Sequence, residues 1–166
     1  MRIAKIKPND IANGEGICVS VWTQGCPHRC KGCHNATTWS FTGGREFTEQ
    51  VKVDVLHMLD LKISRDLSVL GGEPLWDENF DGVLDLCRFI KAKRPHTKIN
   101  LWTGYEWEEV INSRKVEILP LLETICVGRF VLEKRDIRLK FRGSSNQMVI
   151  DVPKTLKSKE VVMKYE

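Results

Sequence analysis

Three cysteines within eight residues constrain this chain more than any other feature of its sequence. Cys26, Cys30 and Cys33 follow one another at intervals of four and three positions, so their sulfur atoms can bind one metal centre. Sulfur ligands favour zinc or an iron–sulfur cluster. A closed zinc site or a plain cluster takes four protein ligands, so three cysteines leave one metal position for another molecule. In an enzyme, a substrate or cofactor can bind there.

Length and composition indicate one soluble domain spanning residues 1–166. Hydrophobic residues make up 42% of the chain and charged residues 29%, as in ordinary globular proteins. The sequence contains no run of about 18 apolar residues that could span a membrane, and the N-terminus lacks the pattern of a secretion signal. We therefore expect a cytoplasmic protein without a membrane partner. The net charge of +4 is not concentrated in one basic block, so we expect no nucleic-acid partner.

The remaining cysteines, Cys18, Cys87 and Cys126, lie inside apolar runs. A reducing compartment keeps thiols free, and buried cysteine behaves as a small hydrophobic residue. We therefore predict that these three pack in the core, although any of them could in principle supply a fourth metal ligand.

The hydrophobic pattern alternates between strands and helices. We predict helices over 48–59, with Thr48 as the N-cap, and over 78–93. One or two short helices follow at 107–112 and 118–122, interrupted or bent at Pro120. The predicted strands are 17–23, 66–70, 98–102, 124–127 and 148–152, with 160–165 as an edge strand or a frayed tail. The alternation predicts an α/β fold of about five to six mainly parallel strands, too few for a closed eight-unit barrel.

Two motifs follow the first two strands of this pattern. The cysteine loop follows strand 17–23, and Gly71-Gly72-Glu73-Pro74 follows strand 66–70. Parallel α/β folds place their chemistry at such strand ends. Glycines permit close backbone approach, and Glu73 offers a carboxylate to an ammonium group. Alternatively, Gly-Gly before proline is simply a turn that ends a strand.

The combination of these two motifs resembles the radical S-adenosylmethionine (SAM) enzymes. The resemblance implies a partial, open βα barrel and a 4Fe-4S cluster held by Cys26, Cys30 and Cys33. It also implies that the amino and carboxylate groups of SAM bind the fourth iron, while Gly71, Gly72 and Glu73 contact the SAM amino group. The competing interpretation is a zinc site completed by His28, His34 or a remote cysteine.

Further segments are similar to the glycyl-radical activases, and within them to those acting on the anaerobic ribonucleoside-triphosphate reductase. These segments are Cys33-His34-Asn35, Trp39, 101–105, 128–130 and 139–147. The resemblance implies that SAM is contacted by His34, Asn35 and Thr103. From its charge and position we expect Arg129 to reach the SAM carboxylate, although Arg129 could equally be a solvated surface residue. Val127 departs from the family, in which an acidic residue is usual before Gly-Arg-Phe. The segment 142–147 is the most specific part, with a purely structural loop as its alternative role.

The activity implied by the resemblance is reductive cleavage of SAM. The resulting 5'-deoxyadenosyl radical would take a hydrogen atom from a glycine in the large subunit of the reductase. A flavodoxin-like protein would donate the electron. The alternatives are an activase of pyruvate formate-lyase, another small radical SAM enzyme such as a deazaguanine synthase, and an iron–sulfur or zinc binding module that does not cleave SAM.

Overall fold

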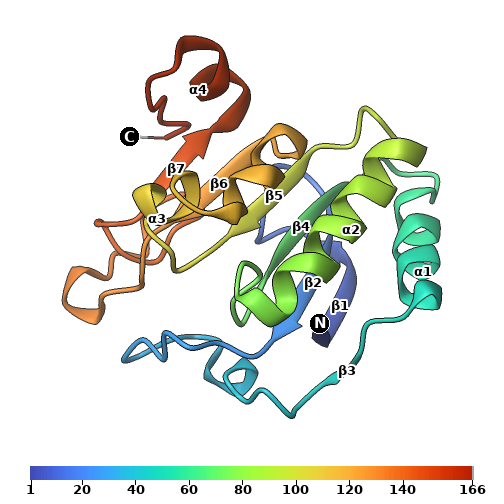
Figure 1. The fold of residues 1–166 in the computed structure, drawn as a ribbon, viewed down its shortest axis with the longest axis horizontal. Helices are drawn as coiled ribbons and strands as arrows, with labels where there is room; N and C mark the ends of the chain where they lie inside the picture. Colours follow the sequence, from blue (N-terminus) through green and yellow to red (C-terminus); the bar gives the residue numbers. More distant parts are fainter. Residues whose placement is uncertain (166) are drawn as a thin grey trace.

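A computed structural model describes residues 1–165, which are organised around one seven-stranded sheet (Figure 1). The strand order is β3-β1-β2-β4-β5-β6-β7, and the sheet is not closed into a barrel. The strands are β1 (Arg2–Asp10), β2 (Cys18–Gln24), β3 (Arg45–Glu46), β4 (Asp66–Gly71), β5 (Ile99–Trp102), β6 (Thr124–Val127) and β7 (Met148–Asp151). The central strands β2, β4, β5 and β6 are parallel, whereas β1, β3 and β7 are antiparallel to their neighbours. The predicted α/β class and parallel centre are confirmed, but the sheet has seven strands rather than five or six.

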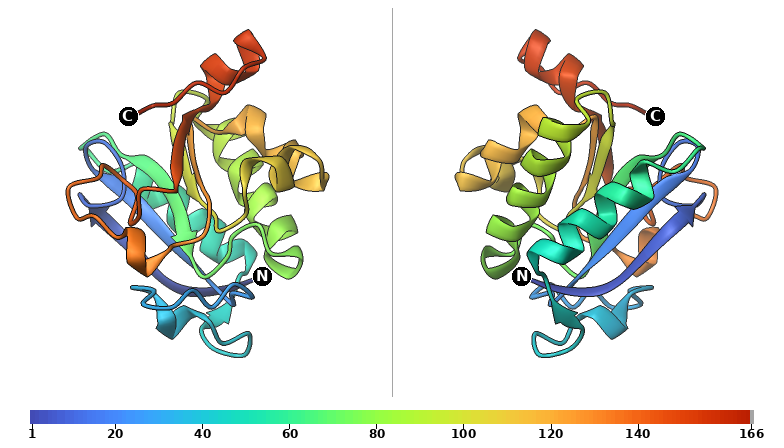
Figure 2. Two further views of the ribbon diagram at one scale, coloured as in Figure 1. Left: turned by 90° about the vertical axis from the view of Figure 1, so that its left-hand side faces the viewer. Right: turned by 90° about the vertical axis from the view of Figure 1, so that its right-hand side faces the viewer.

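The longer helices cover one face of this sheet, whereas the segment 128–147 lies on the side away from them (Figure 2). The helical elements are α1 (Glu49–Leu59), α2 (Asp77–Lys93), α3 (Trp107–Ile111), α4 (Val152–Ser158) and the 3-10 segments η1 (Ala36–Thr38), η2 (Arg114–Leu121) and η3 (Leu132–Lys134). Pro120 lies inside η2, a 3-10 segment that begins at Arg114, four residues earlier than predicted. Within residues 1–165, no helix is both long and apolar enough to cross a membrane.

The two main helices form where the hydrophobic spacing predicted them. The Thr48 hydroxyl accepts a hydrogen bond from the Val51 amide at the start of α1 (3.4 Å), which confirms the predicted N-cap. Val51, Val55 and Leu59 form the buried face of α1. The buried residues of α2 include Cys87, and Cys18 and Cys126 are buried in β2 and β6. All three cysteines therefore pack in the core, and burial raises the pKa of the Cys87 and Cys126 thiols to about 12.

Strand β1 was not predicted, because its sequence is polar and contains Pro8. Its partner β3 pairs only with Arg2 and Ile3, so the rest of β1 has one neighbouring strand. Proline is tolerated on such an edge, where its missing N–H leaves no ladder bond unmade. Only Ile3 and Asp10 of this strand are buried, which explains the weak hydrophobic pattern.

The C-terminal region differs from the predicted strand and tail. β7 ends at Asp151, whose side chain accepts a hydrogen bond from the Lys154 amide (3.1 Å) and caps the unpredicted helix α4. The chain then returns along β7 through a single bridge between Ile150 and Met163 rather than through a full edge strand. The Tyr165 ring lies against Phe141, with ring centroids 5.5 Å apart. The chain end therefore contacts the segment 128–147.

Candidate functional site

A cavity of about 480 Å³ lies at the C-terminal ends of β2, β4 and β5. This volume is typical of a site for a small molecule. The structure brings nine of the ten residues singled out in the sequence to its lining: Cys26, Cys30, Cys33, His34, Asn35, Gly71, Gly72, Glu73 and Thr103. Arg129 is the exception. The cavity therefore joins the cysteine loop to the Gly-Gly-Glu-Pro motif, as expected for strand ends in a parallel sheet.

The cysteine loop directs backbone N–H groups toward its sulfur atoms. Left-handed backbone conformations at Arg29 (φ 46°) and Gly32 (φ 75°) turn the chain tightly between the cysteines. The Asn35 amide donates to Cys33 Sγ (3.4 Å), and nearby backbone amides partly offset the effect of burial on the pKa of the Cys26 and Cys30 thiols. Such bonds stabilise thiolates and are a recurrent feature around iron–sulfur clusters. The loop therefore fits a cluster bound through three cysteines.

The three side chains share the cavity without converging on one point. Across the part of the chain that the structure describes, no three His, Cys, Asp or Glu side chains lie close enough together to hold a metal ion. Burial raises the pKa of the Cys26 thiol to about 11 and also raises that of Cys30. A bound metal lowers thiol pKa values and would counteract this effect of burial.

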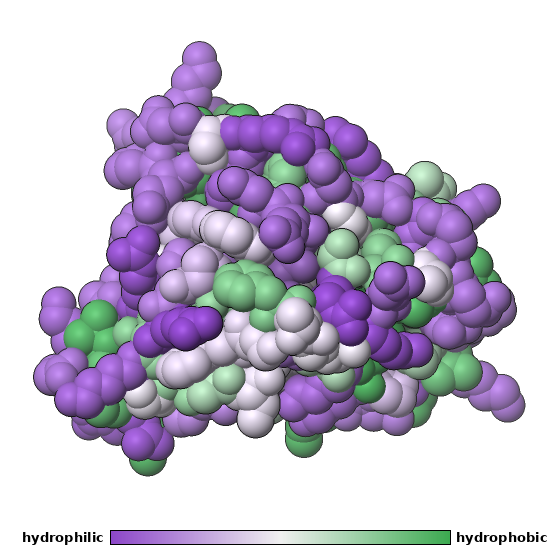
Figure 3. Space-filling view, turned by 60° about the horizontal axis from the view of Figure 1, so that its bottom comes forward, coloured by the Kyte–Doolittle hydropathy of each residue, from purple (hydrophilic) through white to green (hydrophobic). Residues whose placement is uncertain are grey.

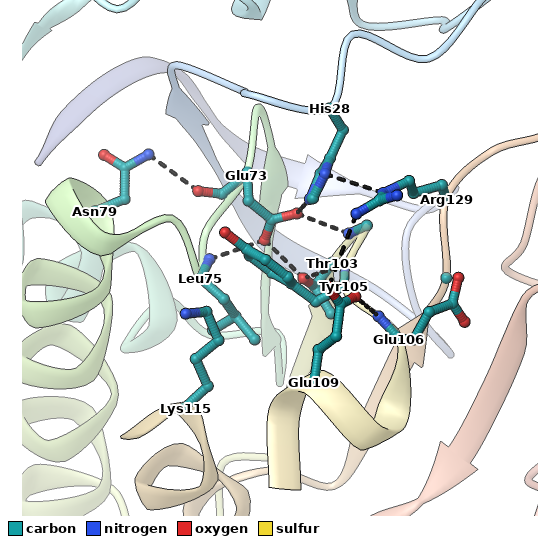
Figure 4. A network of polar contacts seen from close by, with 12 residues as sticks. His28, Glu73, Leu75, Asn79, Thr103, Tyr105, Glu106, Glu109, Lys115 and Arg129 are labelled. Carbon is teal, nitrogen blue, oxygen red and sulfur yellow. Dashed lines mark hydrogen bonds and ion pairs between the residues drawn. The ribbon is translucent and has the colours of Figure 1, made fainter. Parts of the chain in front are cut away.

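The carboxylate of Glu73 forms the most extensive polar network in the cavity wall (Figure 4). Its side chain is fully buried. Oε1 accepts hydrogen bonds from the Thr103 hydroxyl (2.6 Å) and the Leu75 amide (2.9 Å). Oε2 accepts from the Gly104 amide (2.7 Å) and lies 2.8 Å from His28 Nε2. Four protein donors thus surround a carboxylate that the sequence assigned to the SAM amino group.

The two glycines before Glu73 are required by contact with the cysteine loop. A Cβ atom on Gly72 would lie 2.4 Å from the Gly25 carbonyl oxygen, and one on Gly71 would lie 2.7 Å from the Thr23 backbone. The Gly72 amide donates to the Thr23 carbonyl (2.9 Å), and the Glu73 amide donates to the Gly25 carbonyl (2.8 Å). The motif therefore fastens the end of β4 to the start of the cysteine loop.

His28 connects this network to the cysteine loop, and sequence reasoning did not anticipate the role. Its Nδ1 atom accepts a hydrogen bond from Arg129 Nε (3.3 Å), which leaves Nε2 as the donor to Glu73. The ring meets Tyr105 edge to face, with centroids 4.8 Å apart. Because both ring nitrogens bind protein groups, His28 is not the fourth ligand of a zinc site in this arrangement. The only sequence signal was a histidine between two ligand cysteines, 45 residues from Glu73.

Arg129 and Arg142 differ in their position relative to the cavity. The Arg129 side chain is 53% exposed, and its guanidinium contacts His28 and lies 3.8 Å from Glu109. Arg142 does line the cavity, and its Nη1 donates to the Gln147 carbonyl (3.0 Å). Its buried Nε has no hydrogen-bond partner among residues 1–165. Arg142, which the sequence marked only as part of a family-specific segment, is therefore better placed than Arg129 to meet an anionic group in the cavity.

Gln147 explains how the segment 142–147 keeps its shape. Its side-chain oxygen accepts from the Gly143 and Ser144 amides (2.9 and 3.1 Å), and its side-chain nitrogen donates to the Gly128 carbonyl (2.9 Å). This segment thus has a structural role in addition to lining the cavity.

Comparison with known proteins supports the interpretation of the cysteine loop. The family described as "4Fe-4S single cluster domain" matches residues 12–150. The anaerobic ribonucleoside-triphosphate reductase-activating proteins of Vibrio cholerae serotype O1 and Escherichia coli K12 are each 37% identical over 144 residues, covering 86% of this chain and 92% and 93% of theirs. The protein of that name from Enterobacteria phage T4 is 33% identical over 147 residues, covering 89% of this chain and 92% of its own. The chain therefore belongs to the family of anaerobic ribonucleoside-triphosphate reductase-activating proteins and contains a 4Fe-4S single cluster domain.

Proposed function

We propose that this protein is a radical SAM activase that generates the glycyl radical on the anaerobic ribonucleoside-triphosphate reductase. In this proposal, residues 1–166 form one domain, an open βα barrel of radical SAM type. The observation that carries the proposal is the shared cavity, in which three cysteines and the Gly71–Glu73 motif face one another. The relatives that bear the activating-protein name span nearly the same length of chain.

Cys26, Cys30 and Cys33 would hold a 4Fe-4S cluster, and SAM would occupy the rest of the cavity. A cluster held by these cysteines would supply one electron for the reductive cleavage of SAM, the chemistry needed to remove a hydrogen atom from the acceptor glycine. The backbone of Gly71 and Gly72 would contact the amino group of SAM. The Glu73 carboxylate keeps that backbone in place through its four donors.

The remaining cavity residues would bind and orient the cofactor. Arg142, with its unpartnered Nε, would neutralise the SAM carboxylate, a role expected from the sequence for Arg129. His34, Asn35 and Thr103 would complete the contacts. Since the cluster and SAM carry the chemistry, the protein needs no acid–base pair of its own. A flavodoxin-like electron donor, the large subunit of the reductase and a cytoplasmic location complete the proposal.

Anaerobic reconstitution tests the cofactor part of the proposal. We expect about four iron and four sulfide ions per chain, and 5'-deoxyadenosine after reduction with dithionite in the presence of SAM. Zinc without sulfide would contradict the cluster. A stable iron–sulfur cluster that never cleaves SAM would indicate a binding module instead.

The identity of the radical acceptor requires a separate test. The reconstituted protein is mixed with SAM, reductant and either the anaerobic reductase or pyruvate formate-lyase, and the glycyl radical is measured by electron paramagnetic resonance. We expect the signal only with the reductase. A signal only with the lyase would contradict the proposed acceptor while leaving the SAM chemistry intact.

Substitution of a single ligand tests the role of the cysteines. Cys30→Ala should abolish the 4Fe-4S spectrum and all SAM cleavage, because two cysteines cannot hold the cluster. Cys87→Ala, in the buried face of α2, is the matched control and should retain the cluster. A complete spectrum in the Cys30→Ala variant would contradict the assignment of three ligands.

A further inference from the structure

The positive charge of this protein is concentrated in two segments that border the cavity. Residues 28–31 and 129–142 contain eight basic and two acidic residues, a net charge of +6, whereas the whole chain has a net charge of +4. The other residues together are therefore slightly negative. Each segment is short and interrupted, so neither forms a basic block in the sequence.

The fold brings these two segments together, and we call their joint surface the basic rim. Gly32 packs so closely against Leu132 of η3 that an added Cβ would lie 2.9 Å from the Leu132 side chain. Arg129 Nε also donates to His28 Nδ1 (3.3 Å). Figure 3 views the molecule from this end, where pale and green residues form a band that purple hydrophilic residues border. The basic rim therefore continues directly from the cluster-binding loop.

Most charges on the basic rim lack partners within the protein. Arg138 pairs with Asp136 (2.8 Å) and Arg129 with Glu109 (3.8 Å). Within residues 1–165 the six other basic residues form no ion pair: Arg29, Lys31, Lys134, Arg135, Lys140 and Arg142. On the helical face, by contrast, Arg114 pairs with Asp81 and Lys115 with Asp77.

An exposed apolar side chain lies within this charged surface. Ile137 lines the cavity and is 86% exposed, more than any other large hydrophobic residue of the described chain. An exposed isoleucine within a segment rich in basic residues is typical of an interface, where an apolar anchor is enclosed by a polar border.

We propose that the basic rim is the docking surface for an acidic segment of the reductase, with Ile137 as its apolar contact. This inference rests on the proposed function, which requires a protein segment to reach the cavity. Charge complementarity favours a negatively charged partner, and unpaired surface charges mainly accelerate association. The acceptor glycine would thus be guided to the cavity by residues outside the cofactor site.

The test compares two charge-reversal variants of the reconstituted protein. Lys134→Glu/Arg138→Glu alters exposed residues of the basic rim that do not line the cavity. Lys62→Glu/Lys93→Glu makes the same change in net charge at exposed positions after α1 and at the end of α2. Association with the large subunit of the reductase is measured by anaerobic biolayer interferometry at about 50 and 200 mM salt.

We expect the rim variant to associate about tenfold more slowly at low salt and to lose most of its salt dependence. The control should stay within about twofold of the wild type, and both variants should cleave SAM normally without the reductase. Ile137→Ser should mainly accelerate dissociation. Unchanged association of the rim variant would overturn the proposal, as would loss of its reductase-independent cleavage, because the rim would then act on the cavity.

Two further outcomes separate this inference from its alternatives. If a single-stranded DNA of about 20 nucleotides binds more tightly than the reductase and only the rim variant loses that binding, the rim serves nucleic acid and the proposal is wrong. A wild-type protein that binds the reductase but cleaves no SAM would contradict the proposed function and leave the docking surface intact.

Discussion

The two walls of the cavity handle charge in opposite ways. The inner wall, formed by Gly71–Glu73, Thr103, Gly104 and His28, buries one carboxylate and surrounds it with four donors. The outer wall, formed by 129–142, exposes several cations without ion-pair partners among residues 1–165. A buried charge depends strongly on each of its partners, whereas an exposed charge interacts weakly with its own protein. The inner wall is therefore suited to fixing geometry, and the outer wall to recognising another molecule.

The largest expected effect on stability comes from removing the central acceptor of the inner wall. Glu73→Ala leaves the Thr103 hydroxyl, two backbone amides and His28 without their acceptor, and should lower the free energy of unfolding by about 3–5 kcal/mol. Urea denaturation of the metal-free protein under reducing conditions measures this. The exposed Glu108→Ala should change stability by less than about 0.5 kcal/mol. An equally small change for Glu73→Ala would contradict the view that the buried carboxylate of the inner wall depends strongly on its partners.

Removing one donor from the same network should have a smaller effect. His28→Leu deletes the hydrogen bond to a buried carboxylate and should reduce stability by about 1.5–3 kcal/mol. His28→Gln keeps an N–H donor and should restore at least half of that loss. The exposed His96→Leu is the control. If the glutamine and leucine variants are equally unstable, ring packing against Tyr105 matters more than the hydrogen bond.

The contact between the Gly71–Glu73 motif and the start of the cysteine loop can be tested by adding one methyl group at Gly72. In Gly72→Ala the new Cβ would meet the Gly25 carbonyl at 2.4 Å, and relieving this overlap should cost about 1–3 kcal/mol. SAM affinity, measured by equilibrium binding to the reconstituted protein, should also decrease. Gly82→Ala is the comparison variant: its new Cβ would lie 2.7 Å from Met1 Cβ, so the side chain of Met1 has to shift, but no backbone carbonyl is among its nearest neighbours and alanine favours the helix. Equal stability of the two variants would show that the loops can separate without cost.

Substitutions in the outer wall should hardly change the stability of the protein. Lys134→Glu/Arg138→Glu should alter the free energy of unfolding by less than about 0.5 kcal/mol, because exposed ion pairs contribute little. Urea denaturation of the metal-free variant measures this value. A loss above about 1 kcal/mol would mean that the outer wall stabilises the fold, and the contrast between the walls would fail.

Local sequence signals predicted the helices and strands that bury many apolar side chains in a regular pattern. Strand β2 is buried along its whole length, and helices α1 and α2 have clear apolar faces. Strand β1 escaped prediction because only two of its residues are buried. Helix α4 escaped because it buries only Val152 and Thr155, too few for a helical period to stand out.

The sequence predicted most of the residues singled out in the cavity lining, but it did not predict the hydrogen bonds that join them. The spacing of the three cysteines and the position of Gly71–Glu73 after a strand are local properties of the sequence. In contrast, the contacts of Glu73 with Gly104 and His28 span 31 and 45 residues. No local pattern distinguishes a carboxylate that binds a cofactor from one that holds two loops together. The exterior position of Arg129 likewise depends on its distant partner His28.

The hydrogen bonds between Gly72 and Thr23 and between Glu73 and Gly25 bear on the order in which the protein acquires its parts. These bonds, and the carboxylate network beside them, involve no cysteine sulfur. If Cys26, Cys30 and Cys33 hold the proposed cluster, this part of the cavity wall would not depend on it. We therefore expect the metal-free chain to form this wall during folding, so that the proposed cluster would enter a cavity that is already in place.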